Sequence, residues 1–527
     1  MFESNEYKVF WHGLIFMNGS PSGIESIKAF IAELKNKKLE EACGALKGIY
    51  FLSIESKKNG SLFAFVDNSG LYHAYHTYDT VSNSFLDLAI NNKYTSTGFN
   101  PAAVAEFLNF GYLISPFTYF QSIRRIERND ILFVPSPGGE ITIKRKKNKD
   151  YTEQQEIRPE QFEQYFYGLT QSLNNCKTSL DLTGGVDSRL IAAMLDRFGL
   201  EFETATSGGA PDYPDVAISK KVSKALGHPW FCTLHSASGF IDDAADMLLT
   251  TDGLFDLLYY HRLYQLQKDR KMRGIDTLIS GVGGEIFKDY WWLHDFPFYK
   301  KKKADIEKFI HLRIMPNSPI DKLLTHDFAK ASRSLRKTLV DLFSRYILET
   351  NTRTYDNIFF NLIMSNMAGR ILTSHCRHLK CHAPYLDPEI FKIGFNLPRR
   401  MRLYNLFHRK ELTRTNPVIA RLETTENGIS ASYRISNMAL DAPKYLQEKT
   451  QRALIKLRLR NKPNSQLIND SSFYSEIRNS EILRDSLDTL KKAGILHKET
   501  EPDQLDEKHL GAFITLGLVT LKLNFPA

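Results

Sequence analysis

The sequence is poor in cysteine and contains no long hydrophobic run. The cysteine count is odd and no two cysteines form a CxxC pair, so reduced thiols are expected instead of a disulfide framework or a zinc site. The best candidate for a membrane-spanning stretch, residues 511–525, is interrupted by Thr515, Thr520 and Lys522. No stretch of the sequence reaches the roughly 18 apolar residues that a membrane-spanning helix needs. The first residues, MFESNEYK, lack the basic and apolar segments of a secretory signal. We therefore expect a soluble, cytoplasmic protein without a membrane partner. The five cysteines are Cys43, Cys176, Cys232, Cys376 and Cys381.

Charge of one sign is also in small excess. The chain has 69 Lys and Arg against 60 Asp and Glu, a net charge of +9 over 527 residues. Basic residues gather at 300–303 and 456–462, but such runs are more often solvated surface, so no nucleic-acid partner is expected. The hydrophobic content of 42% and charged content of 24% are typical of a globular protein. The length suggests two to four domains.

The first 150 residues are expected to be rich in β-strands. Short β-branched and aromatic runs at Gly48–Ser56, Ser61–Asp67 and Leu71–Thr77 are separated by turn-forming residues, which predicts a set of hairpins. Residues 101–110 have the apolar spacing of a helix. The polar segment KRKKNK at 144–149 is the predicted domain boundary.

Beyond residue 150 the pattern changes to alternating helices and isolated strands. Apolar strands are predicted at 179–182, 203–206 and 277–280, and this alternation indicates a parallel α/β sheet. From about residue 305 the pattern is mainly that of amphipathic helices. The apolar stripes at 480–493 and 510–523 favour helical packing or a partner interface, and a homodimer is kept open. The chain thus divides into residues 1–150 and residues 151–527, and the fold class is α/β.

The most informative segment is KTSLDLTGGVDSRLIAAMLDR, residues 177–197. A strand runs into Thr183–Ser188 (TGGVDS) and a helix follows. Two glycines let backbone amides approach a phosphate group, and the helix N-terminus adds unpaired N–H groups and a positive dipole end. The segment is neither a Walker loop nor a dinucleotide fingerprint. The alternative interpretation is a Gly-Gly turn followed by a helix that Asp187 or Ser188 caps.

At this point the segment resembles the pyrophosphate loop of ATP pyrophosphatases, in particular the asparagine synthetase-like family. Residues 279–287 (ISGVGGEIF) resemble that family's second motif, and residues 383–388 (APYLDP) resemble its third. Residues 151 to about 430 carry this resemblance. More weakly, residues 48–50, 67–72 and 100–112 resemble the class II glutamine amidotransferase domain that precedes such synthetases, which implies an Ntn-like αββα sandwich.

The resemblance implies a site for ATP and Mg²⁺. Asp187 and Glu285 would be the catalytic residues and the ligands of Mg²⁺, which would stabilise the leaving pyrophosphate. Asp215 resembles the family's helix-start Asp, for which a structural cap is the favoured interpretation. The expected nucleotide-binding residues are Leu182, Thr183, Gly184, Gly185, Val186, Asp187, Ser188, Ser207, Ser280, Gly281 and Gly283.

Several positions depart from the family pattern. Amidotransferase chemistry needs Cys directly after the initiator Met, and Phe2 stands there, so glutamine hydrolysis is not expected. The family's polar or ionisable residue after Ser280-Gly281, thought to assist amine deprotonation, is replaced by Val282. The second motif is one residue short, so Gly284-Glu285 replaces small-Asp-Glu.

Two further departures concern basic residues. The segment 421–424 (RLET) stands where the synthetases place a Lys that stabilises the transition states, and spacing does not decide whether Lys410 or Arg414 substitutes. Lys380 and His382 replace the usual Glu and Arg before Pro384. The nucleotide machinery is therefore expected to be kept, and the glutaminase and the known bases to be lost.

This pattern predicts an ATP-dependent, AMP-forming amide synthetase, a ligase that forms C–N bonds. It would activate a small-molecule or peptide carboxylate as an acyl-adenylate and transfer it to a substrate amine, in the same or another molecule, or to ammonia. The alternative is a noncatalytic nucleotide-binding or scaffold relative. A tRNA-thiolating transferase is disfavoured because no pair of thiols suits sulfur relay. The sequence leaves the substrates, the general base and the oligomeric state open.

Two clusters of residues have alternative interpretations. Residues 374–383 contain three histidines and two cysteines, which could bind zinc, line an active site or pack in the core. Tyr290, Trp291, Trp292 and Phe296 follow the second motif and could line a substrate cavity, although a buried aromatic core is the commoner arrangement.

Overall fold

The structure is a computed structural model of the 527-residue chain. It describes residues 1–147, 151–153, 158–234, 237–289, 303–315, 320–425, 428–434 and 471–525, and isolated positions between 436 and 454. The aromatic cluster predicted at 290–296, the basic run at 456–462 and most of the run at 300–303 lie outside the described residues.

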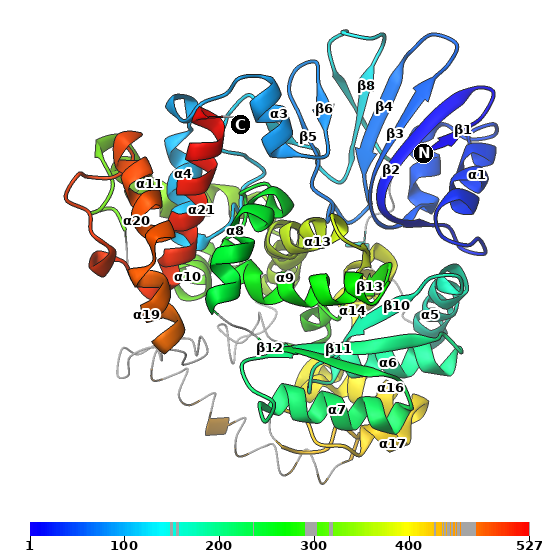
Figure 1. The fold of residues 1–527 in the computed structure, drawn as a ribbon. Helices are drawn as coiled ribbons and strands as arrows, with labels where there is room; N and C mark the ends of the chain where they lie inside the picture. The colour runs from blue at the N-terminus through cyan, green and yellow to red at the C-terminus, as the bar shows by residue number, and fades with distance from the viewer. Residues whose placement is uncertain are drawn as a thin grey trace.

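The N-terminal region is built on a six-stranded antiparallel sheet (Figure 1). Its centre is β3, whose alternate side chains face opposite sides, as the strand period of two requires. Ile49 and Phe51 point into the main core of the protein, whereas Tyr50 and Leu52 pack with Ile27 of helix α1 (Ile24–Glu33). Both faces of the sheet are therefore covered. The strand order is β1 (Phe2–Glu3), β2 (Tyr7–Phe16), β3 (Lys47–Ser56), β4 (Leu62–Val66), β8 (Asp130–Val134) and β9 (Thr142–Arg145).

A second, three-stranded sheet in this region is very short. Its strands β6 (Val81–Ser82), β5 (Tyr75–His76) and β7 (Arg124–Arg125) have two residues each. The strand predicted over Leu71–Thr77 is therefore confined to Tyr75–His76. The helix predicted at 101–110 is confirmed as α4 (Pro101–Phe110), which Asn100 caps by accepting a hydrogen bond from the Ala102 N–H.

Packing crosses the predicted domain boundary near residue 150. Helices α3 (Phe85–Asn91) and α4 share one apolar core with α9 (Leu257–Met272) and the C-terminal helix α21 (Glu507–Asn524). The two halves share both apolar and polar side-chain contacts. The boundary itself stays a prediction.

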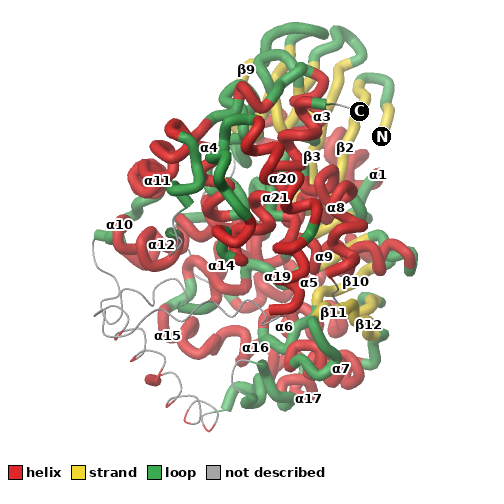
Figure 2. The backbone as a smooth tube through the Cα atoms, turned by 60° about the vertical axis from the view of Figure 1, so that its left-hand side comes forward, coloured by secondary structure: helices red, strands yellow, loops and turns green. Residues whose placement is uncertain are grey.

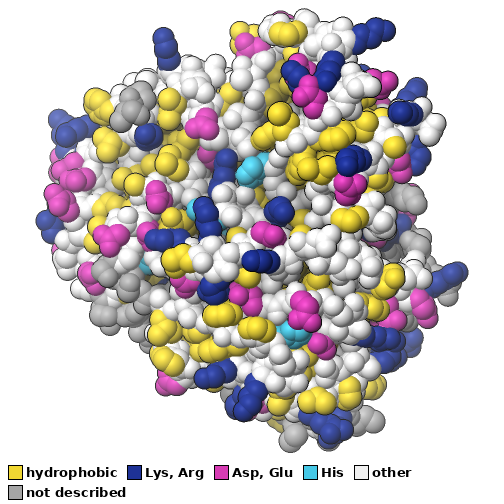
Figure 3. All heavy atoms as spheres, turned by 45° about the vertical axis from the view of Figure 1, so that its right-hand side comes forward, with side chains coloured by type: hydrophobic (Ala, Val, Ile, Leu, Met, Phe, Trp, Pro, Cys, Tyr) yellow, Lys and Arg dark blue, Asp and Glu magenta, His cyan; other side chains and the backbone are white. Residues whose placement is uncertain are grey.

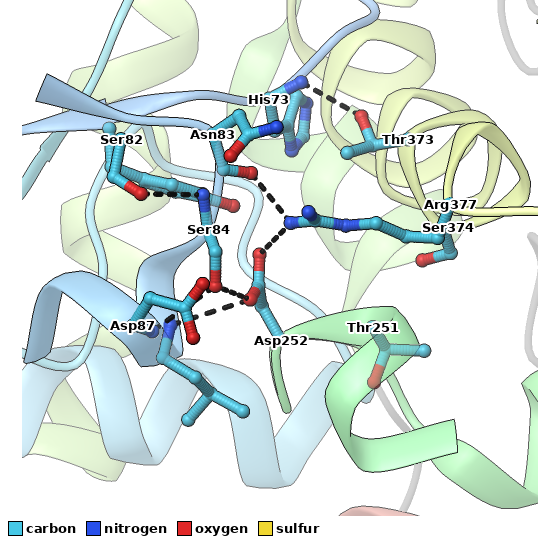
Figure 4. Close-up of polar contacts among 12 residues, drawn as sticks. His73, Ser82, Asn83, Ser84, Asp87, Thr251, Asp252, Thr373, Ser374 and Arg377 are labelled. Atoms are coloured by element: carbon cyan, nitrogen blue, oxygen red, sulfur yellow. Dashed lines mark hydrogen bonds and ion pairs between the residues drawn. The ribbon is translucent and has the colours of Figure 1, made fainter. Parts of the chain in front are cut away.

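One group of polar contacts between the halves centres on Asp252 (Figure 4). Its carboxylate accepts a hydrogen bond of 2.6 Å from Ser84 Oγ and pairs with Arg377 at 3.2 Å. Arg377 also donates to the Asn83 carbonyl at 2.6 Å. The side chain of Asp252 is only 4% exposed, so this ion pair is part of the interior.

The second half contains the predicted parallel sheet, with five strands in the order β12-β11-β10-β13-β14. Thr178 pairs with Phe202 of β11 and with Thr277 of β13. From the central strand β10, the chain adds β11 and then β12 on one side of the sheet. It then returns to the other side of β10 and adds β13 and β14 there. Ligands of open parallel sheets bind at such a switch point, outside the carboxyl ends of the strands. The strands are β10 (Thr178–Asp181), β11 (Phe202–Gly208), β12 (Trp230–Leu234), β13 (Thr277–Ile279) and β14 (Lys380–His382).

Helices cover both sides of this sheet (Figure 1). In that view α8 (Ala237–Thr251), α9 and α13 (Gly369–Cys376) lie above it, and α6 (Asp187–Arg197), α7 (Pro214–Leu226), α16 (Leu406–Thr415) and α17 (Pro417–Ala420) lie below it. The α/β class with a parallel sheet, an antiparallel N-terminal sheet and a helical C-terminal part is confirmed. Further helices are α2 (Leu39–Ala42), α5 (Pro159–Leu173), α10 (Ile306–Phe309), α12 (Asn351–Ile358), α14 (Pro388–Asn396) and α15 (Arg399–Arg402).

The C-terminal helices pack against each other and against the N-terminal region (Figure 2). The apolar stripes predicted at 480–493 and 510–523 belong to α20 (Glu481–Lys492) and α21, and both face one core, with Leu487 and Phe513 buried. They join α19 (Ser471–Asn479) and α11 (His326–Ser344). These stripes are thus used for packing within the chain.

The described surface is mixed in character. On the face drawn in Figure 3, basic and acidic side chains are interspersed without a large area of one sign. Among the described residues, no helix has the length and apolar character needed to cross a membrane.

Candidate active site

The predicted phosphate loop lies at the switch point of the parallel sheet. Strand β10 ends at Asp181, the loop occupies Thr183–Val186, and α6 begins at Asp187. Thr183 is exposed at the carboxyl end of the strand, and its Oγ1 accepts a hydrogen bond from the Gly185 N–H at 3.3 Å and lies 3.1 Å from Ser188 Oγ. The loop therefore presents a hydroxyl group and the N-terminus of an eleven-residue helix, which together favour an anionic group.

A buried arginine fixes the loop to a distant segment of the chain. Arg189 is fully buried and donates to four carbonyl oxygens, those of Gly184, Ile419, Leu422 and Glu423, at 2.8 to 3.2 Å. Segment 419–423 is thus adjacent to the loop, and it overlaps residues 421–424, where the resemblance predicts a Lys.

Gly184 is held from two sides and has no room for a side chain. Its N–H donates to Asp215 Oδ1 at 2.8 Å, and a Cβ at this position would lie 2.3 Å from Thr425 Cγ2. Asp215 does not cap its own helix, α7; its carboxylate takes up the Gly184 amide instead. Asp215 is expected from the sequence to cap a helix, and the structure shows it instead as a hydrogen-bond acceptor for the loop. Glycine is needed at 184 because Thr425 leaves no space for a Cβ.

The second motif reaches the loop directly after β13. A Cβ at Gly281 would lie 3.0 Å from Ser188 Cβ, and Gly283, with φ of 95°, packs against Leu386 of the third motif. Tyr385, also from the third motif, donates its hydroxyl to the Asp187 carbonyl at 2.8 Å. The three motifs predicted from sequence therefore meet at one place.

Asp187 is the most heavily contacted side chain of this site. Lys288 Nζ lies 2.9 Å from its Oδ2, while His408 Nδ1 and Asn405 Nδ2 lie 2.8 and 3.2 Å from its Oδ1. Burial acts to raise the pKa of Asp187, but Lys288 and His408 outweigh it and hold the pKa well below its usual range. The carboxylate is therefore ionised, and its charge is balanced by Lys288.

Glu285 lies in the short 3-10 helix η3 (Gly284–Phe287) beside this ion pair. Burial and the charge of Asp187 raise its pKa. Its Oε2 is buried without a hydrogen-bond partner among the described residues.

The predicted magnesium site has no matching donor set in this geometry. A divalent cation on Asp187 Oδ2 would meet the ammonium group of Lys288, and Oδ1 is already an acceptor for His408 and Asn405. Within the described part of the chain, no group of three or more His, Cys, Asp or Glu side chains could hold a metal ion. Asp187 and Glu285 thus do not fit a magnesium site as they stand, and their metal role stays a prediction.

The other predicted nucleotide-binding residues divide into exposed and buried ones. Leu182 and Val186 have fully buried side chains in the main core, so only their backbone could serve a ligand. Ser207, at the end of β11, and Ser280, after β13, are half-buried. The Ser280 N–H donates to the His382 carbonyl at 2.8 Å, which extends the pairing of β13 with β14.

The positions that depart from the family pattern are accounted for as follows. Val282 packs against the main core, and Glu423 pairs with Lys221 at 2.6 Å. Arg414 pairs with Glu163 and Glu411 at 2.6 Å, and Lys410 is exposed on the same helix, α16. A further cation that the structure brings to the loop, besides Arg189, is Lys288, which sequence reasoning did not single out.

The cluster at 374–383 does not form one site. It spans the end of α13 and strand β14, so its side chains diverge: His375 lies 3.2 Å from Tyr260 Oη, His378 3.2 Å from Thr250 Oγ1, and His382 2.6 Å from Tyr165 Oη. Burial lowers the pKa of His375 and of His382 to about 3. The three histidines are therefore neutral packing residues with separate hydrogen bonds.

A cavity of about 960 Å³ lies between the N-terminal region and helices α5 and α14. Its lining is mixed in charge, with Lys47 paired to Glu389 at 2.6 Å and Lys392 nearby. Asp387, two residues after the tyrosine that contacts Asp187, also borders it. The third motif therefore connects the loop to a cavity suited to a polar ligand.

One family model matches the part of the chain that carries the three motifs. Residues 172–415 match the family model described as asparagine synthase, a family that uses ATP, usually with Mg²⁺. The solved structure of NMN synthetase from Francisella tularensis is similar at 14% identity with a TM-score of 0.22, covering 41% of this chain and 97% of that one. No curated protein matches the chain. Residues 172–415, which match the asparagine synthase model, include all three motifs.

Proposed function

We propose that the chain is an ATP-dependent, AMP-forming amide synthetase that acts on a carboxylate and an amine from outside its own N-terminal region. The observation that carries this proposal is the meeting of the three motifs at the carboxyl ends of β10, β13 and β14. That is where an open parallel sheet binds a nucleotide. The family match to asparagine synthase supports the same reaction class.

In the proposed reaction, a carboxylate oxygen attacks the α-phosphorus of ATP and pyrophosphate leaves. The amine nitrogen then attacks the acyl carbon, loses a proton, and AMP leaves. The side chains around the loop serve in binding: Thr183 and the N-terminus of α6 hold the leaving pyrophosphate, and Ser280 and Ser207 border the rest of the nucleotide. Val282 supplies no proton acceptor, so positioning of the amine carries more of the rate. The cavity bordered by Asp387 is the proposed place of the polar substrates.

The test of binding uses a nonhydrolysable α,β-methylene analogue of ATP and thermal unfolding. Saturating ligand at a hundred times Kd stabilises by about 2.7 kcal/mol, which raises Tm by several degrees. The Thr183→Val variant removes the loop hydroxyl without changing volume and should lose most of this shift. Thr142→Val, at an exposed position on β9, is the matched control and should keep it. Equal shifts in both variants would contradict the site.

The test of the reaction uses ATP labelled at the α-phosphate, pooled carboxylates and hydroxylamine as a substitute amine. Labelled AMP that depends on a carboxylate, together with its hydroxamate, supports the synthetase. The alternative, a noncatalytic nucleotide-binding relative, is favoured by one observation. The positions of the usual base and Lys are occupied by Val282, which is partly buried against the core, and by Glu423, which pairs with Lys221. Nucleotide binding without AMP release from any carboxylate would select that alternative.

A further inference from the structure

We propose that the ammonium group of Lys288 takes the place of a magnesium ion beside the phosphate loop, so that the chain binds the pyrophosphate group of its nucleotide without a divalent cation. This inference rests on the proposed function and specifies how its site handles charge. It concerns the residues that contact the two carboxylate oxygens of Asp187, and it is based on four features of the geometry.

The first feature is the position of Lys288. It directly follows η3 of the second motif, and its Nζ lies 2.9 Å from Asp187 Oδ2. The positive charge is thus held at the first residue of α6, where the loop ends and the helix dipole also favours an anion. The side chain is 23% exposed, so it is not enclosed in the core.

The second feature is the lack of space for a second carboxylate. A Cβ on Gly284 would lie 2.6 Å from Asp187 Cγ and 2.7 Å from its Oδ2. The Asp187 carboxylate therefore rests against the backbone of the second motif. An acidic side chain at 284 would displace it and would also add like charge at close range.

The third feature is the fixed orientation of Asp187. His408 is fully buried, and the centroid of its ring lies 5.0 Å from that of Tyr385 and 4.6 Å from that of Phe287. Its Nδ1 and the amide of Asn405 both contact Oδ1. Because aromatic packing holds the imidazole, the carboxylate is held with Oδ2 toward Lys288. One oxygen is committed to neutral donors and the other to the ammonium group.

The fourth feature is the state of Glu285. Its Oε2 is buried without a hydrogen-bond partner among the described residues, so Lys288 donates to Asp187 and not to this oxygen. A lysine provides a compact charge that binds phosphate oxygens without fixed geometry. Lys288 can therefore serve the anion while Asp187 holds its ammonium group beside the loop, and the ligand class is the pyrophosphate group of a nucleoside triphosphate or inorganic pyrophosphate.

The experiment measures the Kd of inorganic pyrophosphate and of α,β-methylene ATP by titration calorimetry on the full chain, with EDTA and with MgCl₂. Wild type should bind in EDTA within about threefold of its Kd in magnesium. Lys288→Met should weaken binding in EDTA by at least about tenfold, while Lys288→Arg should retain it. The matched control is Lys268→Met, because Lys268 makes a similar ion pair, 2.7 Å from Asp243 on α8, away from the loop.

Asp187→Asn also separates the two explanations. A metal-binding Asp187 would lose nucleotide binding in magnesium on this change, whereas loss of the carboxylate that anchors Lys288 should weaken binding in EDTA by less than Lys288→Met does. If Lys288→Met does not fold, the Asp187→Asn/Lys288→Met double variant removes both charges and should fail to bind in EDTA.

The outcomes distinguish this inference from the proposed function. Wild-type binding that requires magnesium, or unchanged binding by a folded Lys288→Met variant in EDTA, would overturn the inference and leave the proposed function standing. Absence of binding in both buffers would overturn the proposed function and the inference with it.

Discussion

Asp187 and Asp387 both belong to predicted motifs and are both largely enclosed, yet their electrostatic states are opposite. Asp187 is held at a pKa well below its usual range by Lys288 and His408, although burial acts in the other direction. For Asp387, burial raises the pKa to about 6, with Lys47 opposing this and Glu389 adding to it. Lys47 is 2.6 Å from Glu389, so its charge is shared with a competing carboxylate.

The difference shows that the nearest cation, and not the motif, decides what a buried carboxylate does. Asp187 is a permanent anion that anchors Lys288 beside the loop. Asp387 caps α14 by accepting the Glu389 N–H at 3.0 Å, a role that a neutral amide can also fill. The predictions below test this contrast.

A third carboxylate, Asp252, extends the comparison to a place far from the loop and should give the largest change in stability. Asp252→Asn keeps the shape and tolerates the positive φ of 54°, but leaves the Arg377 charge without its partner. We expect a loss of about 3 kcal/mol in the free energy of unfolding, measured by urea denaturation. Binding of pyrophosphate should not change. Asp79→Asn, at a half-buried surface carboxylate, is the control and should leave the free energy of unfolding nearly unchanged.

Removing the cation from Asp187 should give the next largest effect. Lys288→Met leaves a poorly solvated carboxylate unpaired and should cost about 2 to 3 kcal/mol at neutral pH. Adding Asp187→Asn should restore most of this loss, and a double-mutant cycle measures the coupling. If the two single changes prove additive, the ion pair does not carry the charge balance described for this site.

The same pair predicts the sign of a pH effect. Because the pKa of Asp187 is lower in the folded than in the unfolded chain, where it is near 3.8, its ionised form stabilises the fold above about pH 4. This contribution is lost as the pH falls further. Acid unfolding of wild type and Asp187→Asn should therefore converge at low pH.

Asp387 should show the opposite slope. Its pKa is raised from 3.8 to about 6, so its contribution to stability is full below about pH 4 and is lost as the pH rises through 6. Relative to wild type, Asp387→Asn should gain about 2 kcal/mol between pH 4 and pH 8, measured by urea denaturation at each pH. A flat difference between the two proteins over this range would remove the contrast with Asp187.

The smallest effect is expected at Asn405, the weakest of the three contacts to Asp187. Its φ of 59° suits glycine, so Asn405→Gly removes the side chain without straining the backbone. The bond to Asp187 is 3.2 Å long, and Asn405 Oδ1 is buried without a partner among the described residues. We expect a change in stability of less than about 1 kcal/mol, with pyrophosphate binding kept. A loss comparable to that of Lys288→Met would show that the amide, and not the ammonium group, anchors Asp187.

The local elements of this protein could be predicted from its sequence. Residues 101–110 are the helix that their spacing indicates, and the strands predicted at 179–182, 203–206 and 277–280 are β10, β11 and β13. Strand β14 is not predicted because its three residues, Lys380–His382, lie within the cluster of His and Cys, where ligand chemistry is a stronger signal than strand propensity.

The partners of Asp187 could not be predicted because they come from separate segments. His408 lies 221 residues further along the chain, and no pattern around it points to the loop. Lys288 directly follows the second motif, so it could have been considered as a residue of the site. Its significance depends on the contact between Gly284 and Asp187, which only the fold reveals. The one-residue shortening of the second motif is visible in the sequence, but its consequence is not.

The four carbonyl bonds of Arg189 have a mechanical consequence. They join the phosphate loop to segment 419–423 across more than 230 residues of sequence. The two segments must therefore move together. A displacement of segment 419–423 would therefore be transmitted through the Arg189 side chain to Gly184 of the loop.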